Sequence, residues 1–178
     1  MSAVLESERL ILRPLALSDA TTIRELAGDY EVAKTTLVIP HPYPEGAAET
    51  YIQSLIDDPE QHVFAIVRRS DQQLMGSIGI HPEPRFKRAM LGYWIGVPYW
   101  NQGYMSEAAR RLIDYGFEAL VLNRIYAYYL SQNIASRRVM EKAGMVYEAT
   151  FRQHVERFGN FYDVGYCGIL RSDWAADD

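Results

Sequence analysis

The segment from Leu91 to Ala109 constrains the fold more than any other part of the sequence. It begins with aromatic and β-branched residues typical of a strand, breaks at Pro98, turns tightly at Gly103 and enters the first turn of a helix. A strand that passes through a glycine turn into a helix leaves several backbone N–H groups unpaired at the positive end of the helix dipole. Gly103 also has no side chain to keep a ligand away. The segment therefore predicts an anion-binding site.

The single glycine limits which anion sites this turn can be. The segment contains neither Gly-x-Gly-x-x-Gly nor the Gly-Lys-Ser/Thr ending of a nucleoside-triphosphate loop, so dinucleotide and ATP sites lose their main support. On composition alone, an ordinary strand–turn–helix joint explains the segment equally well. The rest of the chain has to decide between the two interpretations.

Length and charge limit the domain organisation and the partners. With 178 residues, 48% of them hydrophobic, the chain suits one domain over residues 1–178, with a frayed acidic tail from about residue 172. The net charge is −5 and no long run of Lys or Arg occurs. A nucleic-acid partner is therefore not expected, because a phosphate backbone requires a basic surface.

Cysteine and apolar patterns exclude further classes of site. Cys167 is the only cysteine, so neither an internal disulfide nor a zinc site built on cysteine pairs is predicted, and its apolar flanks suggest a buried strand. The amino terminus has no apolar stretch of signal-peptide length, and no segment is apolar over a membrane-spanning length. We expect a cytoplasmic protein without a membrane partner and without a metal.

Alternating strand and helix patterns predict a mixed α/β fold. Closely spaced strands over residues 62–69, 74–81 and 91–97 should form an antiparallel meander. A helix over 104–120 then leads to a strand over 123–130, so that the strands before and after this helix run parallel. The remaining predicted elements are a strand at 9–13, helices ending near Gly28 and covering 44–57 and 133–143, and a closing hairpin of 145–157 with 161–170.

Three prolines between Thr35 and Pro44 predict an extended loop rather than a helix. Such a loop can roof a pocket, with His41 and Tyr43 touching a substrate. A solvent-exposed connector is an equally good interpretation.

Four motifs, in this order, closely resemble successive segments of the GNAT acetyltransferases, in particular their RimJ/RimL-like branch. They are Leu91-Gly92-Tyr93-Trp94-Ile95, Trp100 to Ala108, Asn123-Arg124-Ile125 and Asn133 to Met145. Residues 9–14, 39–43 and 148–166 are similar to that branch as well, so the resemblance covers nearly the whole chain. It implies an α/β fold of α+β type: a mixed, mostly antiparallel central sheet with flanking helices, in which the strands at 91–97 and 124–130 splay apart.

The resemblance also implies a co-substrate, acetyl-CoA, in the gap between the splayed strands. Backbone groups of Ile95 and Val97 would pair with its pantetheine arm, and Asn133 matches a pantetheine-contacting amide of the family. The pyrophosphate would be held by the turn amides of Gln102, Gly103, Tyr104, Met105 and Ser106. Met105 departs from the usual Ala or Gly, so its longer side chain must point away from the phosphates.

By the same resemblance, the reaction is a direct attack of a neutral amine on the thioester, without an acyl-enzyme. The Ile95 N–H would serve as an oxyanion donor, and the Ser136 hydroxyl would protonate the departing thiolate. A serine on a helix surface that only caps or solvates is the plainer interpretation of Ser136.

The general base is the least constrained part of the site. The strand at 91–97 carries no acid, and RimL-like proteins resemble this chain in placing an acid near Glu156, which is our first choice. A register shift of one residue would turn that side chain to the other face of its strand. Other candidates by residue type are His81, Glu83, His154 and Asp163. A water chain without a dedicated base is an equal alternative.

Three functions remain open at this stage. The first is an acetyl-CoA-dependent N-acetyltransferase acting on an α-amine, either of a protein N-terminus, as in ribosomal-protein acetylation, or of a small molecule. The second is a catalytically silent acyl-CoA-binding sensor, suggested by the missing acid on the central strand. The third is an interaction module that keeps only the fold. The sequence leaves open whether the protein forms a homodimer, and its acidic balance favours cationic acceptors slightly.

Overall fold

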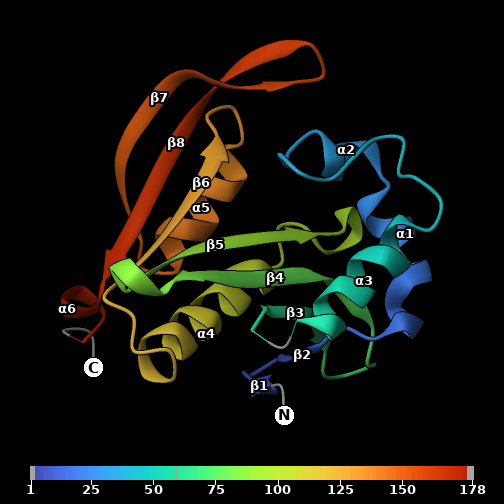
Figure 1. Ribbon diagram of the computed structural model, residues 1–178, viewed down its shortest axis with the longest axis horizontal. Coiled ribbons are helices and arrows are strands. Elements are labelled where there is room, and N and C mark those ends of the chain that lie inside the picture. Colours follow the sequence, from blue (N-terminus) through green and yellow to red (C-terminus); the bar gives the residue numbers. More distant parts are fainter. Residues whose placement is uncertain (1–2, 59, 176–178) are drawn as a thin grey trace.

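A single sheet organises the structure, a computed structural model that describes residues 3–58 and 60–175. Within those residues eight strands follow the order β1-β2-β3-β4-β5-β6-β8-β7 (Figure 1). The strands are β1 (Leu5–Glu6), β2 (Leu10–Pro14), β3 (His62–Arg68), β4 (Leu74–Glu83), β5 (Arg88–Ile95), β6 (Arg124–Leu130), β7 (Val146–Arg157) and β8 (Asn160–Leu170). Neighbouring strands are antiparallel except β5 and β6, which are parallel. The predicted mixed, mostly antiparallel sheet is confirmed.

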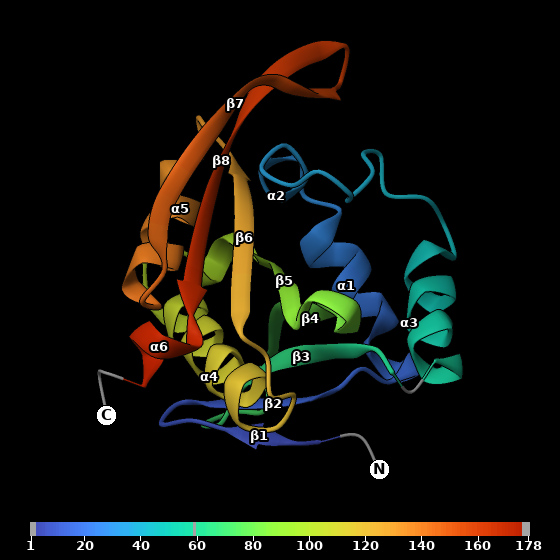
Figure 2. The ribbon, with the colours of Figure 1, turned by 60° about the vertical axis from the view of Figure 1, so that its left-hand side comes forward.

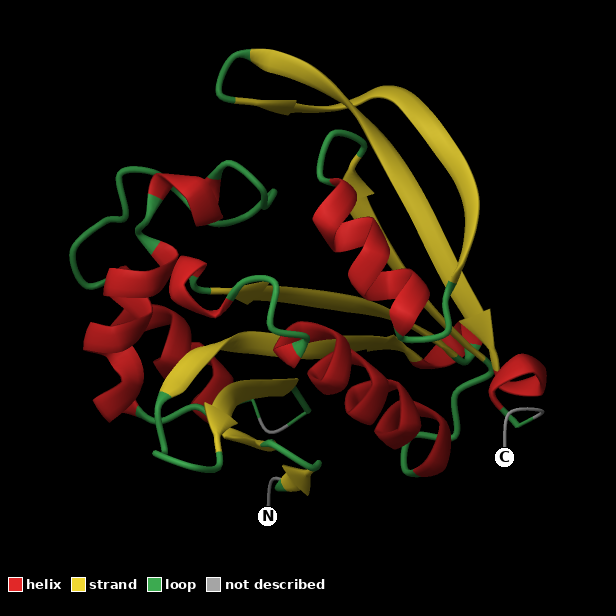
Figure 3. Cartoon of the chain, turned by 180° about the vertical axis from the view of Figure 1, so that it is seen from behind, coloured by secondary structure: helices red, strands yellow, loops and turns green. Residues whose placement is uncertain are grey.

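Helices cover both faces of this sheet. The longer helices are α1 (Ala20–Ala27), α3 (Ala47–Asp57), α4 (Tyr104–Glu118) and α5 (Ile134–Lys142), and the short ones are α2 (Tyr30–Ala33) and α6 (Arg171–Trp174). Helices α4 and α5 contribute to one core cluster, α1 and α3 to the other (Figure 3). Helix α4 buries an apolar stripe that includes Ala108, Leu112 and Phe117, each 0% exposed, as its helical spacing predicts.

The parallel strands β5 and β6 stay together only at their beginnings. Their register runs from Arg88 opposite Arg124 to Met90 opposite Tyr126, and no further pairing joins them within the described residues. Beyond that point β5 continues along β4 while β6 follows β8, so the two strands diverge (Figures 1 and 2). This divergence confirms the predicted splay, and beyond Met90 it leaves one edge of β5 without a neighbouring strand among the described residues.

Several predicted boundaries differ from the structure. The helix expected from Pro44 begins at Ala47, because Gly46 adopts a left-handed conformation (φ 73°) at its start. The strand expected to reach Val97 ends at Ile95, and Val97–Tyr99 form a 3₁₀ turn. Strand β1 and helix α2 were not predicted, since neither is long enough to show a periodic pattern.

Residues 172–174 of the predicted frayed tail belong to a short helix, α6 (Arg171–Trp174). Trp174 in α6 donates a hydrogen bond from Nε1 to Asp114 Oδ1 at 2.8 Å, and its ring lies 5.3 Å from that of Phe117. Residues 176–178 lie outside the described part of the chain. No described helix combines the length and apolar character required to cross a membrane.

Candidate functional site

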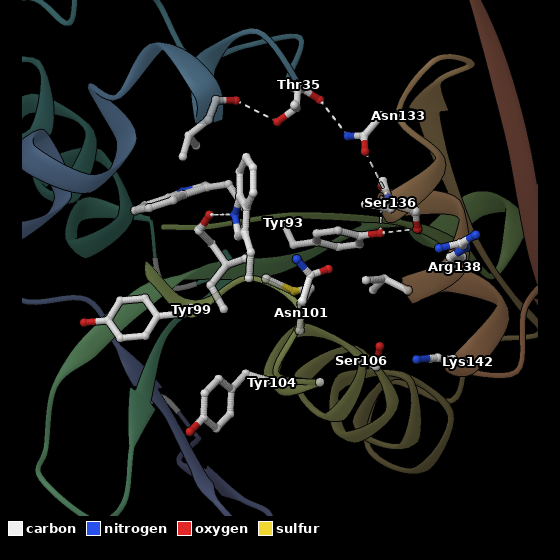
Figure 4. Close-up of a pocket in the computed structure, with 18 of the residues that line it drawn as sticks. Thr35, Tyr93, Tyr99, Asn101, Tyr104, Ser106, Asn133, Ser136, Arg138 and Lys142 are labelled. Atoms are coloured by element: carbon white, nitrogen blue, oxygen red, sulfur yellow. Dashed lines mark hydrogen bonds between the residues drawn. The ribbon is translucent and has the colours of Figure 1, made fainter. Parts of the chain in front are cut away.

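A cavity of about 390 Å³ opens where β5 and β6 diverge (Figure 4). Its walls come from five segments: the end of β5, the turn before α4, the first residues of α4, one face of α5, and the loop after α2. They belong to three separate stretches of the sequence, residues 32–36, 93–106 and 133–142. The cavity is therefore built by the packing of these distant stretches beside the end of β5, and not by any single motif.

The turn before α4 has the geometry of an anion site. Asn101 (φ 60°) and Gly103 (φ 80°) both adopt left-handed conformations, and no side chain caps the helix start. The helical ladder begins with the bond from Glu107 N–H to the Gly103 carbonyl at 3.1 Å. The N–H groups of Tyr104, Met105 and Ser106 therefore precede the ladder, and all three residues line the cavity with Gly103. The turn predicted to bind an anion therefore lies at the wall of this cavity.

Arg9, in the turn between β1 and β2, brings a positive charge to this turn. Its Nε lies 2.7 Å from Glu107 Oε2, and its Nη1 donates to the Gln102 carbonyl at 3.0 Å. Its Nη2 would lie 3.4 Å from a Cβ atom built on Gly103. Burial opposes ionisation of Glu107, but hydrogen bonds from the Arg9 backbone, the Ser7 hydroxyl and the Arg9 guanidinium hold its pKa below the usual value. The negative charge of Glu107 is thus offset by its ion pair with Arg9, so Glu107 does not repel an anion at the turn.

Helix α5 presents two further cations to the cavity. Arg138 and Lys142 are four residues apart, so they lie on the same face of the helix, and both line the cavity. Sequence reasoning missed Arg9, Arg138 and Lys142. The i, i+4 spacing was available as a signal for the last two, whereas the contact of Arg9 with a helix almost one hundred residues away was not.

Asn133 and Ser136 lie together at the start of α5. Asn133 caps the helix, because its Oδ1 accepts the Ser136 N–H at 3.1 Å, and its Nδ2 donates to the Thr35 carbonyl at 3.4 Å. The Tyr93 hydroxyl, from β5, lies 2.9 Å from Ser136 Oγ and 3.1 Å from the Ser136 carbonyl oxygen (Figure 4). Burial raises the pKa of Tyr93 above its usual value, so the hydroxyl stays protonated. Tyr93 was not among the predicted site residues.

The free edge of β5 carries the backbone groups of Ile95. Gly96 N–H bonds to the Met75 carbonyl of β4 at 2.9 Å, so strand alternation turns the backbone of Ile95 to the opposite edge. There the Ile95 carbonyl accepts the Trp100 Nε1–H at 2.8 Å.

Val97, Gln102 and Met105 differ in how they meet the cavity. Val97 does not line it, and its carbonyl accepts the Trp100 N–H at 3.1 Å within the 3₁₀ turn. The Gln102 side chain is also outside it and donates to the Pro98 carbonyl at 2.9 Å. Met105 lines the cavity and belongs to the main core cluster, being 5% exposed.

Glu156 lies outside the cavity lining. It is exposed, and its Oε1 accepts the Gly159 N–H at 3.1 Å in the turn of the β7–β8 hairpin. The next residue, Arg157, points to the opposite face and donates to the carbonyls of Ala33 and Ile39. The one-residue alternation of the strand therefore gives the loop contact to Arg157 instead of Glu156. The role of Glu156 as a base stays a prediction, and no contact in the described structure supports it.

The other candidate bases also have different surroundings. Glu83 pairs with Arg88 and accepts the Tyr126 hydroxyl at 2.9 Å, and Asp163 accepts the Gln153 N–H at 2.8 Å. Among the described residues that line the cavity there is no Asp, Glu or His. Nor do three or more such side chains or Cys gather as a metal-binding group in the described part of the chain.

The loop after α2 forms one wall of the cavity through Thr35 and Thr36. His41 instead lies near the Gly28 carbonyl, with Nδ1 at 3.2 Å, and neither it nor Tyr43 lines the cavity. The interpretation of the proline-rich segment as a roof is thus supported for its first residues only.

Comparisons with known proteins agree with this geometry. Residues 9–146 match the family model described as Acetyltransferase (GNAT) domain. YoaA of Bacillus subtilis (strain 168), an uncharacterized N-acetyltransferase, is 32% identical over 96% of this chain and 98% of its own length. YdaF of the same organism, by its name a candidate ribosomal N-acetyltransferase, is 28% identical over 96% of each chain. The crystal structure of a GNAT-family acetyltransferase from Bacillus anthracis superimposes with a TM-score of 0.86 at 28% identity, covering 96% of this chain and 99% of that one.

Proposed function

Because this chain belongs to the GNAT acetyltransferase family, we propose that it transfers the acetyl group of acetyl-CoA directly to the α-amine of an acceptor. The observation that carries the proposal is the cavity in the splay of β5 and β6, with the uncapped start of α4 at one wall and the cations of α5 at another. Acetyl-CoA supplies the activated acetyl thioester when bound.

The residues around the cavity fit the chemistry of acetyl-CoA. The N–H groups at the start of α4 can donate to a pyrophosphate, and Gly103 leaves room for close approach because it has no Cβ atom. Arg138 and Lys142 add positive charge for the phosphates, while Arg9 offsets the negative charge of Glu107 beside the turn. The free edge of β5 offers backbone groups at which the pantetheine amides can pair as another strand would.

The reaction requires that the amine nitrogen bond to the acetyl carbon while the carbon–sulfur bond breaks, and that the proton lost from nitrogen end on sulfur. In the proposed roles the Ile95 N–H, on the free edge of β5, stabilises charge on the carbonyl oxygen. The Ser136 hydroxyl gives a proton to the departing sulfur. Asn133 supports the role of Ser136 by fixing its backbone at the start of α5.

Proton removal from the amine is proposed to occur through water. The described lining of the cavity contains no acidic side chain or histidine, and Glu156 is engaged with the hairpin turn. The amine must then arrive neutral, so the rate should rise with pH until the pKa of the acceptor amine is passed. A Glu156→Gln variant that loses acetyl transfer but still binds CoA would instead favour Glu156 as the base.

A protein N-terminal amine is the acceptor class we propose. The name of YdaF points to ribosomal N-acetylation, and the net charge of −5 favours basic peptides through electrostatic steering. The α-amine of a free amino acid is the alternative, since it presents the same nucleophile on a smaller body.

The test is acetyl-CoA consumption by the purified protein, followed by release of CoA thiol. The panel would contain N-terminal peptides of ribosomal proteins, the same peptides with a blocked α-amine, and free amino acids. We expect CoA release with unblocked basic peptides and a mass increase at their N-terminal residue. Tight CoA binding without turnover on any amine would mean that the protein is an acyl-CoA sensor and not an enzyme. Absence of CoA binding would refute the proposed function.

A further inference from the structure

Tyr93 and Ser136 join the two sides of the cavity. Tyr93 stands on the central strand β5, Ser136 in the first turn of α5, and these elements are otherwise separated by the splay. The Tyr93 hydroxyl reaches both the Oγ (2.9 Å) and the carbonyl oxygen (3.1 Å) of Ser136 (Figure 4). Within the described part of the chain, the contact with Tyr93 is the only hydrogen bond that the Ser136 hydroxyl makes.

The contact decides where the serine proton can point. A serine within a helix usually donates its hydroxyl proton to a carbonyl of the preceding turn, so that the proton is not available to a bound ligand. Here the backbone N–H of Ser136 is already fixed by the Asn133 cap. The single proton of the Tyr93 hydroxyl can go to the Ser136 carbonyl at 3.1 Å or to Ser136 Oγ, which is the nearer of the two at 2.9 Å. If Tyr93 donates to Ser136 Oγ, the single serine proton is left to point into the cavity, which both residues line.

We propose that Tyr93 is a positioning residue for the acetyl transfer: its hydroxyl donates to Ser136 Oγ and directs the serine proton toward the departing sulfur. The inference rests on the proposed function. Ser136 gives its proton to sulfur as the carbon–sulfur bond breaks, and it recovers a proton from the one that the amine nitrogen releases to water. Tyr93 keeps its own proton throughout, because burial makes its ionisation unfavourable.

The test is a double-mutant cycle of Tyr93→Phe and Ser136→Ala, measured in single-turnover experiments so that the chemical step is observed. Ser136→Ala should lower the rate about a hundredfold, within the range of a general acid. Tyr93→Phe keeps the ring in β5 and should lower the rate about tenfold, the effect of one neutral hydrogen bond. In the Ser136→Ala background Tyr93→Phe should have no further effect, because there is no hydroxyl left to position.

A matched control and a binding measurement separate positioning from loss of structure. Tyr115→Phe also removes one tyrosine hydroxyl contact, to His62 Nδ1 at 3.2 Å, but lies outside the cavity, so its rate should equal that of the wild type. Calorimetric titration of CoA and desulfo-CoA should show that the wild type prefers CoA. That preference should weaken in Tyr93→Phe and disappear in Ser136→Ala, while affinity for desulfo-CoA stays constant in both.

Two results would overturn the inference: a fully active Tyr93→Phe variant, or equal fractional losses from Tyr93→Phe with and without the Ser136 hydroxyl. The second would mean that Tyr93 acts on the rate through the fold alone. Failure of the proposed function is a different result, since it would appear as a wild type that turns over no amine.

Discussion

Gly103 and Gly46 provide a matched pair for testing the anion site. Both glycines stand at the start of a helix without a side-chain cap, Gly103 (φ 80°, ψ −3°) before α4 and Gly46 (φ 73°, ψ −5°) before α3. Only Gly103 lines the cavity. Replacing each by alanine therefore imposes the same backbone strain at two places, of which one should contact the co-substrate.

The structure fixes the expected magnitudes. A Cβ atom on Gly46 would meet nothing within 4 Å, and one on Gly103 would meet only Arg9 Nη2 at 3.4 Å, so neither alanine clashes with the protein. Each variant should lose about 1–2 kcal/mol of unfolding free energy from the left-handed conformation alone. This corresponds to a fall in Tm of about 2–8 °C for a chain of this size.

Binding should separate the two variants. In Gly103→Ala the new methyl group holds the pyrophosphate away from the N–H groups of α4, and the loss of one charge-assisted hydrogen bond weakens binding of CoA about tenfold or more. Gly103→Glu adds a negative charge at the same position and should abolish measurable binding. Gly46→Ala should bind CoA as the wild type does.

The assay is calorimetric titration of CoA and acetyl-CoA, with thermal unfolding of the same samples. The reasoning fails if Gly103→Ala loses stability as expected but binds CoA with wild-type affinity, because the turn would then not contact the ligand. It also fails if Gly46→Ala weakens CoA binding by the same factor as Gly103→Ala.

Three further predictions concern charge. Arg138→Ala and Lys142→Ala should each weaken CoA binding about fivefold at low ionic strength and less in high salt, because exposed charges are screened; titrations at two salt concentrations would check this. Asp19→Asn should lower the unfolding free energy by about 1–2 kcal/mol, since Asp19 accepts two hydrogen bonds of 2.8 Å from Arg13. Burial opposes the ionisation of Asp19, but these hydrogen bonds lower its pKa. Their contribution to the unfolding free energy is therefore present above the usual carboxyl pKa of 3.8 and is lost as the pH falls through the lowered value. Denaturant titrations between pH 7 and pH 2 should show that loss in the wild type but not in Asp19→Asn. Arg157→Met should raise KM for the acceptor severalfold and leave CoA affinity unchanged, which steady-state kinetics and titration would show together.

The fold was predictable where one face of an element is buried. In α4 the buried residues recur at helical spacing, and short turns separate strands β3, β4 and β5 of the meander. Both patterns can be recognised within one short stretch of sequence. The misplaced boundaries have other causes. Pro44 suits the first turn of a helix, but Gly46 adopts a left-handed backbone conformation and α3 therefore begins at Ala47. Helix α6 forms within the predicted tail because Trp174 packs on α4, a contact that acidic composition does not reveal.

The candidate site was predictable only in its local part. The turn of Gly103 and the cap formed by Asn133 each lie within one short segment, where residue types alone indicate the geometry. The partnership of Tyr93 with Ser136 and that of Arg9 with Glu107 depend on how distant elements meet. A single sequence carries no signal for such contacts, because a tyrosine in a strand and an arginine beside it have many ordinary uses.

The choice between Glu156 and its neighbour shows how a small error in register moves a functional assignment. Arg157, not Glu156, faces the loop after α2, where it donates to the Ala33 and Ile39 carbonyls. That loop supplies Thr35 to the cavity wall, and Asn133 holds it from the other side through the Thr35 carbonyl. The β7–β8 hairpin is thereby connected to the loop at the cavity wall, whereas the turn before α4, which we propose to bind the phosphates, is held separately by Arg9. Changes in the hairpin should therefore alter which acceptor is used without altering how CoA is bound.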